Sequence, residues 1–225
     1  MYLRHTIHGY MKNYKIEYVP ENQLIIDGES NHELWENAHV LSEFYSPWEP
    51  EEIKKIEFRA LYDSNNFYFS FKVYDHELYI DLKDNTVESI GNSDRVELFF
   101  RADSKLNPYY CLEIDPQVRI MDFKALPNKN FDFDWNWPKG HIDVKSAIET
   151  THFSVEGAIS LSSLRELGLL NGNRLEVGVF RAKYTKTEKG DYEPTWITWV
   201  DPQTPEPNFH IASSFGSMEL KYKKR

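Results

Sequence analysis

The 225-residue sequence has little cysteine: Cys111 stands alone, which excludes an internal disulfide framework and any zinc site built from several cysteines. Its place in a Tyr-Tyr-Cys-Leu-Glu-Ile run indicates a strand residue. The chain also lacks an apolar run of the roughly 18 residues that a membrane span needs. Its first residues lack the basic segment and apolar run of a secretion signal. We therefore expect a soluble chain without membrane association. A trimmed signal, or a natural start at Met11, stays open, and so do the compartment and the oligomeric state.

Basic residues are also few. Lys and Arg number 26 against 36 Asp and Glu, which gives a formal net charge of -10. A field of this sign repels phosphate backbones, so nucleic acid is not an expected partner. Only the terminal segment 221–225 is locally basic, and we interpret it as a solvated end.

Aromatic residues, in contrast, are plentiful, with 14 Tyr, 14 Phe and 6 Trp. The apolar residues mostly alternate with polar ones, and Gly, Pro, Asn and Asp clusters separate the runs, which predicts an all-β fold. We find no repeat or linker, so residues 21–225 are expected to form one β-sandwich, with residues 1–20 as an N-terminal arm or extra strand. The predicted strands are Glu57 to Tyr62, Phe67 to Tyr74, Arg95 to Arg101, Tyr109 to Ile114, Phe153 to Leu161 and Leu175 to Lys183.

One short helix is predicted over Ser162 to Leu167. Ser163 and Glu166 have the spacing of a capping box, and Gly168 can adopt the left-handed conformation that ends a helix. The stretch from Leu126 to Gly140 is interpreted as an ordered loop or irregular strand, because prolines and glycine interrupt its aromatic residues.

Several separated motifs resemble the family 9 carbohydrate-binding modules attached to xylanases, within the wider DOMON-like group. No one of them is specific, but their order and spacing from Ile26 to Leu220 are. They are Ile26-Asp27-Gly28 with Glu33-Leu34-Trp35, the run Phe67 to Asp75, Ser93-Asp94-Arg95-Val96-Glu97-Leu98-Phe99-Phe100, Phe153-Ser154-Val155-Glu156-Gly157, Gly178 to Arg181, Trp196 to Asp201, and Asn208-Phe209-His210 leading to Phe215-Gly216.

This resemblance implies a β-sandwich of jelly-roll or immunoglobulin-like character. It also implies recognition of a plant-type polysaccharide, such as xylan or cellulose, or of its oligosaccharides, without catalysis and in the service of a xylanase-type glycoside hydrolase. No cofactor is expected. Structural calcium occurs in the resembled family, and Asp27, Asp63 or Asp75 could supply oxygen ligands.

The resemblance also assigns residues to the sugar site. Family members hold a terminal sugar between two aromatic rings and bind its hydroxyls through a carboxylate, whose position Glu97 occupies. Phe209 falls where one stacking tryptophan lies. Where the other tryptophan should lie the chain reads Ile90-Gly91-Asn92, so a second ring would have to come from a loop.

The residue pattern gives a separate argument for Glu97. Alternation along a strand places Arg95 and Glu97 on one face and Val96 and Leu98 on the other, so Glu97 leaves the core side. The alternative is a cross-strand ion pair on a solvated face. Further candidates on strands expected nearby are Tyr110, Glu113 and Arg181, the last of which could equally form a salt bridge with Glu97.

Loop residues complete the set of ligand-binding candidates. Trp196 and Trp199 should point to opposite faces, so at least one is expected at the surface. Asn208 and His210 follow a proline-rich turn that would stiffen their loop. The loop and strand candidates are Trp48, Trp135, Trp137, Trp199, Asn208 and His210, each with packing or capping as its alternative.

Three competing functions are weighed against sugar binding. Glu97, Glu113 and Glu156 could supply the acid and base of a glycosidase, although no paired-carboxylate motif goes beyond strand alternation. Haem binding occurs in some DOMON-like domains, but only Met121 lies near a plausible strand as a methionine ligand. A protein-interaction sandwich without a small ligand is the third alternative.

Overall fold

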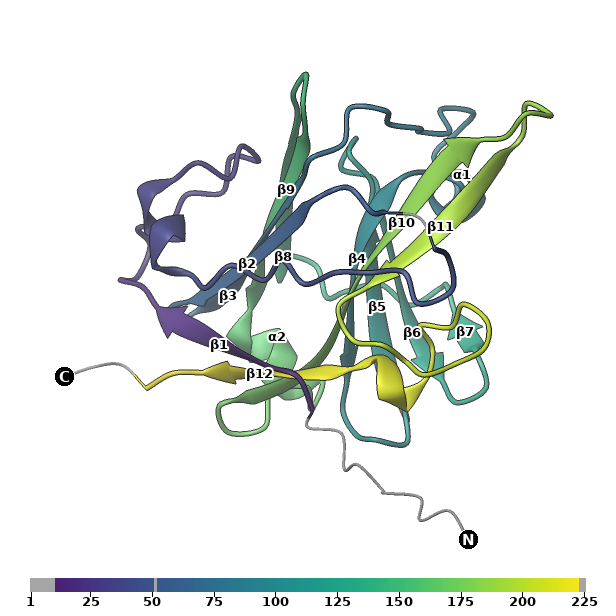
Figure 1. Ribbon diagram of the computed structural model, residues 1–225. Helices are drawn as coiled ribbons and strands as arrows, with labels where there is room; N and C mark the ends of the chain where they lie inside the picture. Colours follow the sequence, from purple (N-terminus) through teal and green to yellow (C-terminus); the bar gives the residue numbers. More distant parts are fainter. Residues whose placement is uncertain (1–10, 51, 223–225) are drawn as a thin grey trace, which may run out of the picture.

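The chain folds as two facing β-sheets joined by strands that run from one to the other (Figure 1). The computed structural model describes residues 11–50 and 52–222. Within them are twelve strands: eleven follow the order β7-β6-β5-β4-β10-β12-β1-β2-β3-β9-β8, and β11 pairs with β10 beside this path. The predicted all-β sandwich is confirmed.

The first sheet consists of six strands and the hairpin partner β11. Its strands are β4 (Arg95–Arg101), β5 (Tyr109–Ile114), β6 (Ile120–Leu126), β7 (Asn130–Asp132), β10 (Arg174–Lys186), β11 (Tyr192–Thr198) and β12 (Gly216–Leu220). Successive strands from β7 to β10 pair antiparallel. The prediction of β4 and β5 matches their bounds in the structure.

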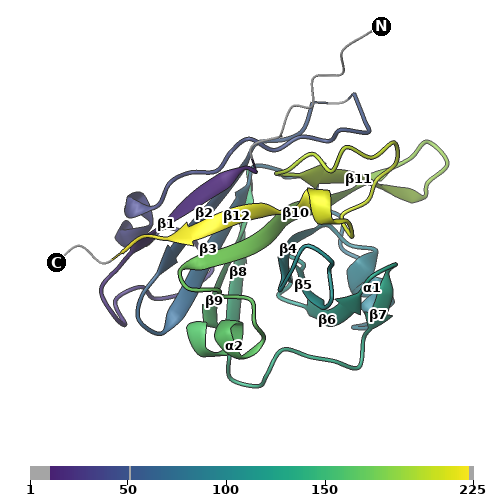
Figure 2. The same cartoon turned by 90° about the horizontal axis from the view of Figure 1, so that it is seen from below.

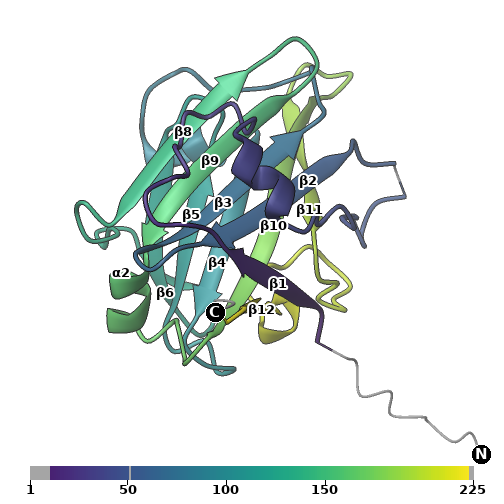
Figure 3. The same ribbon diagram turned by 90° about the vertical axis from the view of Figure 1, so that its left-hand side faces the viewer.

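The second sheet faces the viewer in Figure 3. Its strands are β1 (Asn13–Tyr18), β2 (Ile56–Tyr62), β3 (Asn66–Val73), β8 (Ile142–Ile148) and β9 (Phe153–Ser160). β1 pairs in parallel with both β12 and β2, and so connects the two sheets. Of the predicted N-terminal arm or extra strand over residues 1–20, the structure describes the part from residue 11 on, which contains β1, while residues 1–10 lie outside the described part of the chain.

The main core lies between the sheets and follows the period-two pattern of the strands. Val96, Leu98 and Phe100 of β4 face Phe67 and Phe69 of β3 in one buried cluster. The opposite side chains of the first sheet form a second cluster outside the sandwich, with Phe99, Cys111, Phe123, Phe180 and Phe209 among its members. The first sheet thus has apolar layers on both faces, and its outer layer supports the candidate site.

Short helices occupy the ends of the sandwich. The predicted helix is α2 (Leu161–Glu166), which lies beside β8 and β9 (Figure 2). Its N-cap is Ser160, whose side chain accepts from the Ser163 backbone N–H at 3.1 Å, so the predicted capping pair was wrong. Gly168 has φ +72°, as predicted. Three further short elements were not predicted from the sequence: α1 (Val87–Gly91) and the 3-10 turns η1 (Glu33–Asn37) and η2 (Ala212–Ser214).

The helices of residues 11–50 and 52–222 are all too short or too polar to span a bilayer.

Candidate functional site

Three charged side chains form the floor of a pocket on the outer face of the first sheet. Glu97 of β4 and Glu113 of β5 are directly opposite each other in the strand register, and Arg95 is two residues before Glu97. Strand alternation therefore places all three on the same face. Arg95 Nε lies 2.6 Å from Oε2 of Glu113 and 3.0 Å from Oε1 of Glu97. The two carboxylates share one guanidinium.

Glu97 Oε1 is a buried acceptor without a hydrogen bond from any described residue. The Glu97 side chain is 1% exposed, and Arg95 donates its Nε hydrogen to Glu113 rather than to Glu97. A second Arg95 nitrogen, Nη1, donates to the Gly91 carbonyl at 2.6 Å. A buried oxygen left in this way costs free energy until a donor reaches it. The floor is therefore prepared to accept a hydrogen bond from a ligand.

The electrostatics of the floor follow from burial and from the paired carboxylates. Burial and the neighbouring Glu113 raise the pKa of Glu97 to about 8, although Arg95 opposes the shift. Burial also raises the pKa of Glu113. Burial disfavours the charge of Arg95, but Glu113 and Glu97 outweigh it and raise the pKa of Arg95. Burial and the like charges of the two carboxylates therefore favour one proton on the Glu97–Glu113 pair.

Aromatic rings form the walls of the pocket, whose volume is about 240 Å³. Trp196 of β11 is half-buried, lies edge-on to Phe209 with centroids 5.6 Å apart, and has the Arg95 guanidinium 5.5 Å from its ring centroid. Phe131 of β7 is also half-buried and lies 4.8 Å from the ring of His210. The wall thus presents ring surfaces beside the charged floor.

Phe209 is held in the wall by a ring from the sheet beneath it. It stacks on Phe180 of β10 with centroids 4.1 Å apart and an interplanar angle of 11°. Phe180 lies flat across β10 because residue 178 is glycine: a Cβ there would come within 2.4 Å of the Phe180 ring. Gly178, two residues before Phe180, therefore determines how the wall is built.

His210 is a neutral imidazole in this site. Burial, together with the charges of Lys129 and Arg95, lowers the pKa of His210 to about 3. Its Nδ1 lies 3.1 Å from the Tyr109 hydroxyl, and its backbone N–H donates to the Asn208 side chain at 3.1 Å. If Tyr109 donates to Nδ1, the Nε2 hydrogen of His210 is free to donate to a ligand acceptor.

The chain is similar to known proteins in sequence and in fold. The family model described as carbohydrate family 9 binding domain-like matches residues 26–223. The chain belongs to this family. No curated protein matches this chain.

Three solved structures share its fold. A family 9 carbohydrate-binding module from Caldicellulosiruptor kristjanssonii in complex with cellotriose is 17% identical, with TM-score 0.63 and 95% of each chain covered. The same organism's family 9 module in complex with glucose is 18% identical, with TM-score 0.61, and the match covers 95% of this chain and 97% of that one. A protein from Bacteroides uniformis is 15% identical, with TM-score 0.70, and covers 94% of this chain and all of the other.

Six of the predicted site residues come together in the pocket, from three separate segments of the chain. They are Arg95, Glu97, Glu113, Asn208, Phe209 and His210. Phe209 differs from the expectation in one respect: it is only 5% exposed, and Phe180 covers one of its faces. The half-buried rings Trp196 and Phe131 are more accessible to a ligand than Phe209.

Two of the predicted site residues are on strands of the first sheet but face away from the pocket. Tyr110 faces the main core, because it is three residues from Glu113 and so alternates to the other side. Arg181 is opposite Val96 in the register and is buried between the sheets, where it donates to Asp75 at 2.6 Å. The alternative of a salt bridge from Arg181 to Glu97 was wrong as well, because Arg181 is on the opposite face and pairs with Asp75.

Four predicted tryptophans also lie outside the pocket. Trp137 and Trp199 are buried in the main core, and Trp135 packs against that core beside Tyr110 with centroids 4.8 Å apart. Trp48 lies next to the pocket wall, 6.0 Å from Phe209, with its indole N–H donated to the Thr204 carbonyl. Trp196 and Trp199 do point to opposite faces, but Trp196 is the one at the pocket.

Four residues that line the pocket were not among the predicted site residues: Lys129, Phe131, Trp196 and Pro207. Alternation gave a usable signal for Trp196, because it is three residues from Trp199 and so points to the opposite face. Phe131 had a signal as well, since it alternates with polar residues in the short strand β7. Lys129 and Pro207 lie in turns, where no sequence period predicts a direction.

The residues proposed as calcium ligands do not fit a shared site. Asp75 is bound to Arg181, Asp63 accepts the backbone N–H groups of Asn65 and Asn66, and Asp27 accepts that of Glu29. In the described residues no three His, Cys, Asp or Glu side chains gather where they could hold a metal ion. Calcium binding stays a prediction with no residues assigned to it.

Proposed function

We propose that the pocket above Glu97 binds one unit of a plant-type polysaccharide of the xylan or cellulose kind, or of its oligosaccharides. The observation that carries the proposal is Oε1 of Glu97, which lies near Arg95 Nε but accepts no hydrogen bond from the described residues, at the base of a pocket with aromatic walls. A sugar hydroxyl can donate to this oxygen while the C–H face of the ring packs on Trp196 or Phe131. Membership of the carbohydrate family 9 binding domain-like family supports the same ligand class.

The size and polarity of the pocket favour a small neutral ligand. Its volume of about 240 Å³ is below the roughly 300–1,000 Å³ of pockets for drug-sized ligands, which fits one sugar unit better than several. With one proton on the Glu97–Glu113 pair, the Arg95 charge is balanced by the remaining carboxylate charge, so the floor adds no net charge. Donors and acceptors are both present, which matches the hydroxyl groups of a sugar.

The arrangement of the carboxylates favours binding over hydrolysis. A glycosidase holds its two carboxyl groups on either side of the bond that breaks. Glu97 and Glu113 instead lie side by side on neighbouring strands and contact the same nitrogen of Arg95. Glu156, the third candidate, is in the second sheet and accepts hydrogen bonds from Gly28 and Trp35. We therefore propose a non-catalytic domain that serves a xylanase-type glycoside hydrolase.

Calorimetric titration with glucose, xylose, cello-oligosaccharides and xylo-oligosaccharides tests the proposal. We expect saturable binding at one site, and the ratio of the two affinity series gives the sugar preference. The same mixtures, analysed by chromatography after prolonged incubation, should contain no shortened products. Absence of binding to every sugar would overturn the proposal, and sugar cleavage that Glu97→Gln abolishes would overturn its non-catalytic part.

A further inference from the structure

Phe133 is a large exposed ring next to the pocket. Its side chain is 45% exposed, and it packs on Phe123 with centroids 4.8 Å apart and on Phe131 with centroids 5.8 Å apart. Phe131 in turn lines the pocket and lies 4.8 Å from His210. The contacts form a continuous row of rings that begins inside the pocket and ends at the surface.

The loop that carries Phe133 is fixed on both sides. Before it, β7 pairs with β6 in a hairpin whose register joins Ala125 to Phe131. After it, the Asp134 backbone N–H donates to Asp132 at 3.3 Å, and the Trp137 indole N–H donates to Ser163 at 3.1 Å from within the core. A ring held in this way loses little freedom when a ligand packs on it, which favours affinity.

The pocket has room for one sugar unit, so the rest of an oligosaccharide must continue over the rim. Two exposed lining residues, Lys129 and Pro207, belong to the rim. Beyond Lys129 and Phe131 the surface continues to Phe133, where Asp132 and Asp134 are also exposed. A ring face flanked by carboxylate acceptors is the combination that packs a sugar's C–H face and accepts its hydroxyl hydrogens.

We propose that Phe133 forms a second sugar subsite, which holds the next unit of an oligosaccharide whose first unit occupies the pocket above Glu97. The inference rests on the proposed function, because it needs the pocket to hold a sugar. The second subsite gives the protein a preference for longer oligosaccharides. It binds a trisaccharide more tightly than the corresponding monosaccharide, and Phe133 causes the difference.

The test compares glucose and cellotriose, and xylose and xylotriose, by calorimetric titration of the wild type and Phe133→Ala. We expect the wild type to bind each trisaccharide several-fold more tightly than the monosaccharide. Phe133→Ala should leave monosaccharide affinity unchanged and weaken the trisaccharide several-fold. Phe133→Tyr keeps the ring and should retain the wild-type ratio.

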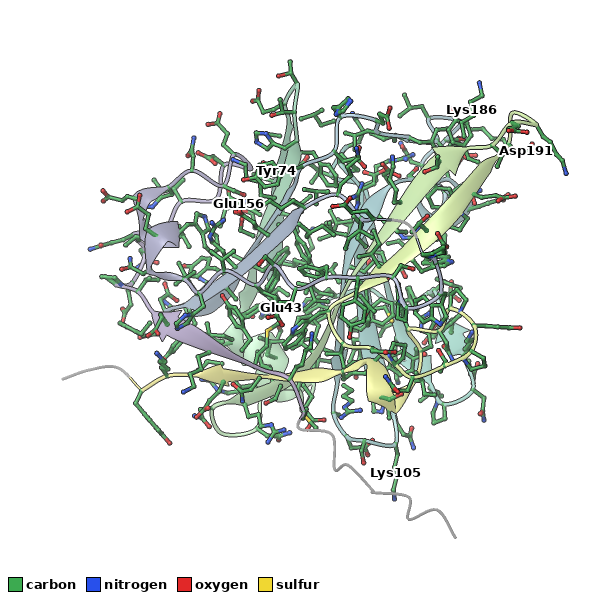
Figure 4. All side chains as sticks on the ribbon, in the orientation of Figure 1. Glu43, Tyr74, Lys105, Glu156, Lys186 and Asp191 are labelled. Atoms are coloured by element: carbon green, nitrogen blue, oxygen red, sulfur yellow. The ribbon has the colours of Figure 1, made fainter. Side chains whose placement is uncertain are left out.

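Tyr192→Ala is the matched control. Tyr192 is 37% exposed and follows Asp191 at the tip of the β10–β11 hairpin, which Figure 4 marks with Lys186 and Asp191. Tyr192→Ala should change neither the monosaccharide affinity nor the trisaccharide affinity. Equal wild-type affinities for mono- and trisaccharide, or equal losses of both in Phe133→Ala, would overturn the subsite while sugar binding itself stands. A wild type that binds no sugar would overturn the proposed function and the subsite together.

Discussion

Glu97 and Glu113 are opposite each other in neighbouring strands, and both contact Nε of Arg95. Like charges in direct cross-strand pairs destabilise a sheet, and burial increases that cost. The protein reduces the cost by keeping a proton on Glu97, because burial and Glu113 raise its pKa to about 8. An arrangement that costs stability in this way is common at functional sites.

Replacement of Glu97 by glutamine should weaken sugar binding and leave the fold intact. Glutamine has nearly the shape of the protonated carboxyl, but its amide oxygen cannot become charged when a hydroxyl donates to it. Hydrogen bonds to charged groups contribute about 1.5–3 kcal/mol, so we expect roughly a tenfold or greater loss of affinity by calorimetry. The melting temperature should fall by no more than a few degrees. Glu57→Gln, a buried carboxylate of β2 paired with Lys55, serves as the control.

Sugar affinity should rise with pH up to about 8. A hydroxyl that donates to Glu97 favours the ionised carboxylate, so the sugar lowers the pKa of Glu97 and binding releases a proton below pH 8. Titrations at pH 6, 7 and 8 in buffers of different ionisation enthalpy measure both the affinity and the proton. Affinity independent of pH in the wild type would contradict the assignment of Glu97 as the acceptor.

The stability of the free protein should have the opposite pH dependence. The pKa of Glu97 is higher in the folded state, at about 8, than its ordinary value of 4.5. The folded protein therefore binds more protons between these values, and the free energy of unfolding falls as pH rises through this range. Denaturant unfolding at pH 5 and pH 8 should show a smaller decline for Glu97→Gln than for the wild type. If the free energy of unfolding declined equally in Glu97→Gln and in the wild type, the group that titrates would be one other than Glu97.

Replacement of Trp196 should affect mainly sugar affinity, whereas replacement of Phe209 should affect mainly the stability of the fold. Trp196 is half-buried at the pocket, so Trp196→Ala should remove a ring contact of about 1 kcal/mol or more and weaken binding several-fold, with a small effect on unfolding. Phe209 is buried against Phe180, and its truncation should cost about 3–5 kcal/mol of stability. Calorimetry and chemical unfolding of both variants measure the two effects. A large affinity loss in Phe209→Ala at full stability would instead make Phe209 the sugar platform.

Glu156 should be structural. Figure 4 places it in the second sheet, away from the first sheet that carries the pocket, and it accepts from the Asp27 and Gly28 backbone N–H groups and from Trp35 Nε1. Glu156→Ala leaves these donors unpaired, which should lower the free energy of unfolding by about 2 kcal/mol or more. The affinity of the folded fraction for sugar should match the wild type. A selective loss of affinity would show that this buried network reaches the pocket.

The sequence by itself determined the sandwich and the composition of the pocket floor. Period-two alternation in residues 95–101 separates Glu97 from the core side because successive side chains of a strand leave opposite faces. The same rule, applied to residues 109–114, would have separated Glu113 from Tyr110. Local geometry is sufficient for such assignments, since they depend only on neighbours along the strand.

Only the tertiary structure decided which rings form the walls. Trp196, Phe131 and His210 come from β11, β7 and the loop before η2, and their meeting depends on how these segments fold back over the first sheet. Arg181 shows the converse, because its charge is neutralised by Asp75 from a distant loop and it is buried between the sheets. Contacts between segments far apart in sequence have no local period. The strand pattern therefore predicts the residues of the pocket floor, whereas tertiary packing decides which rings line the walls above it.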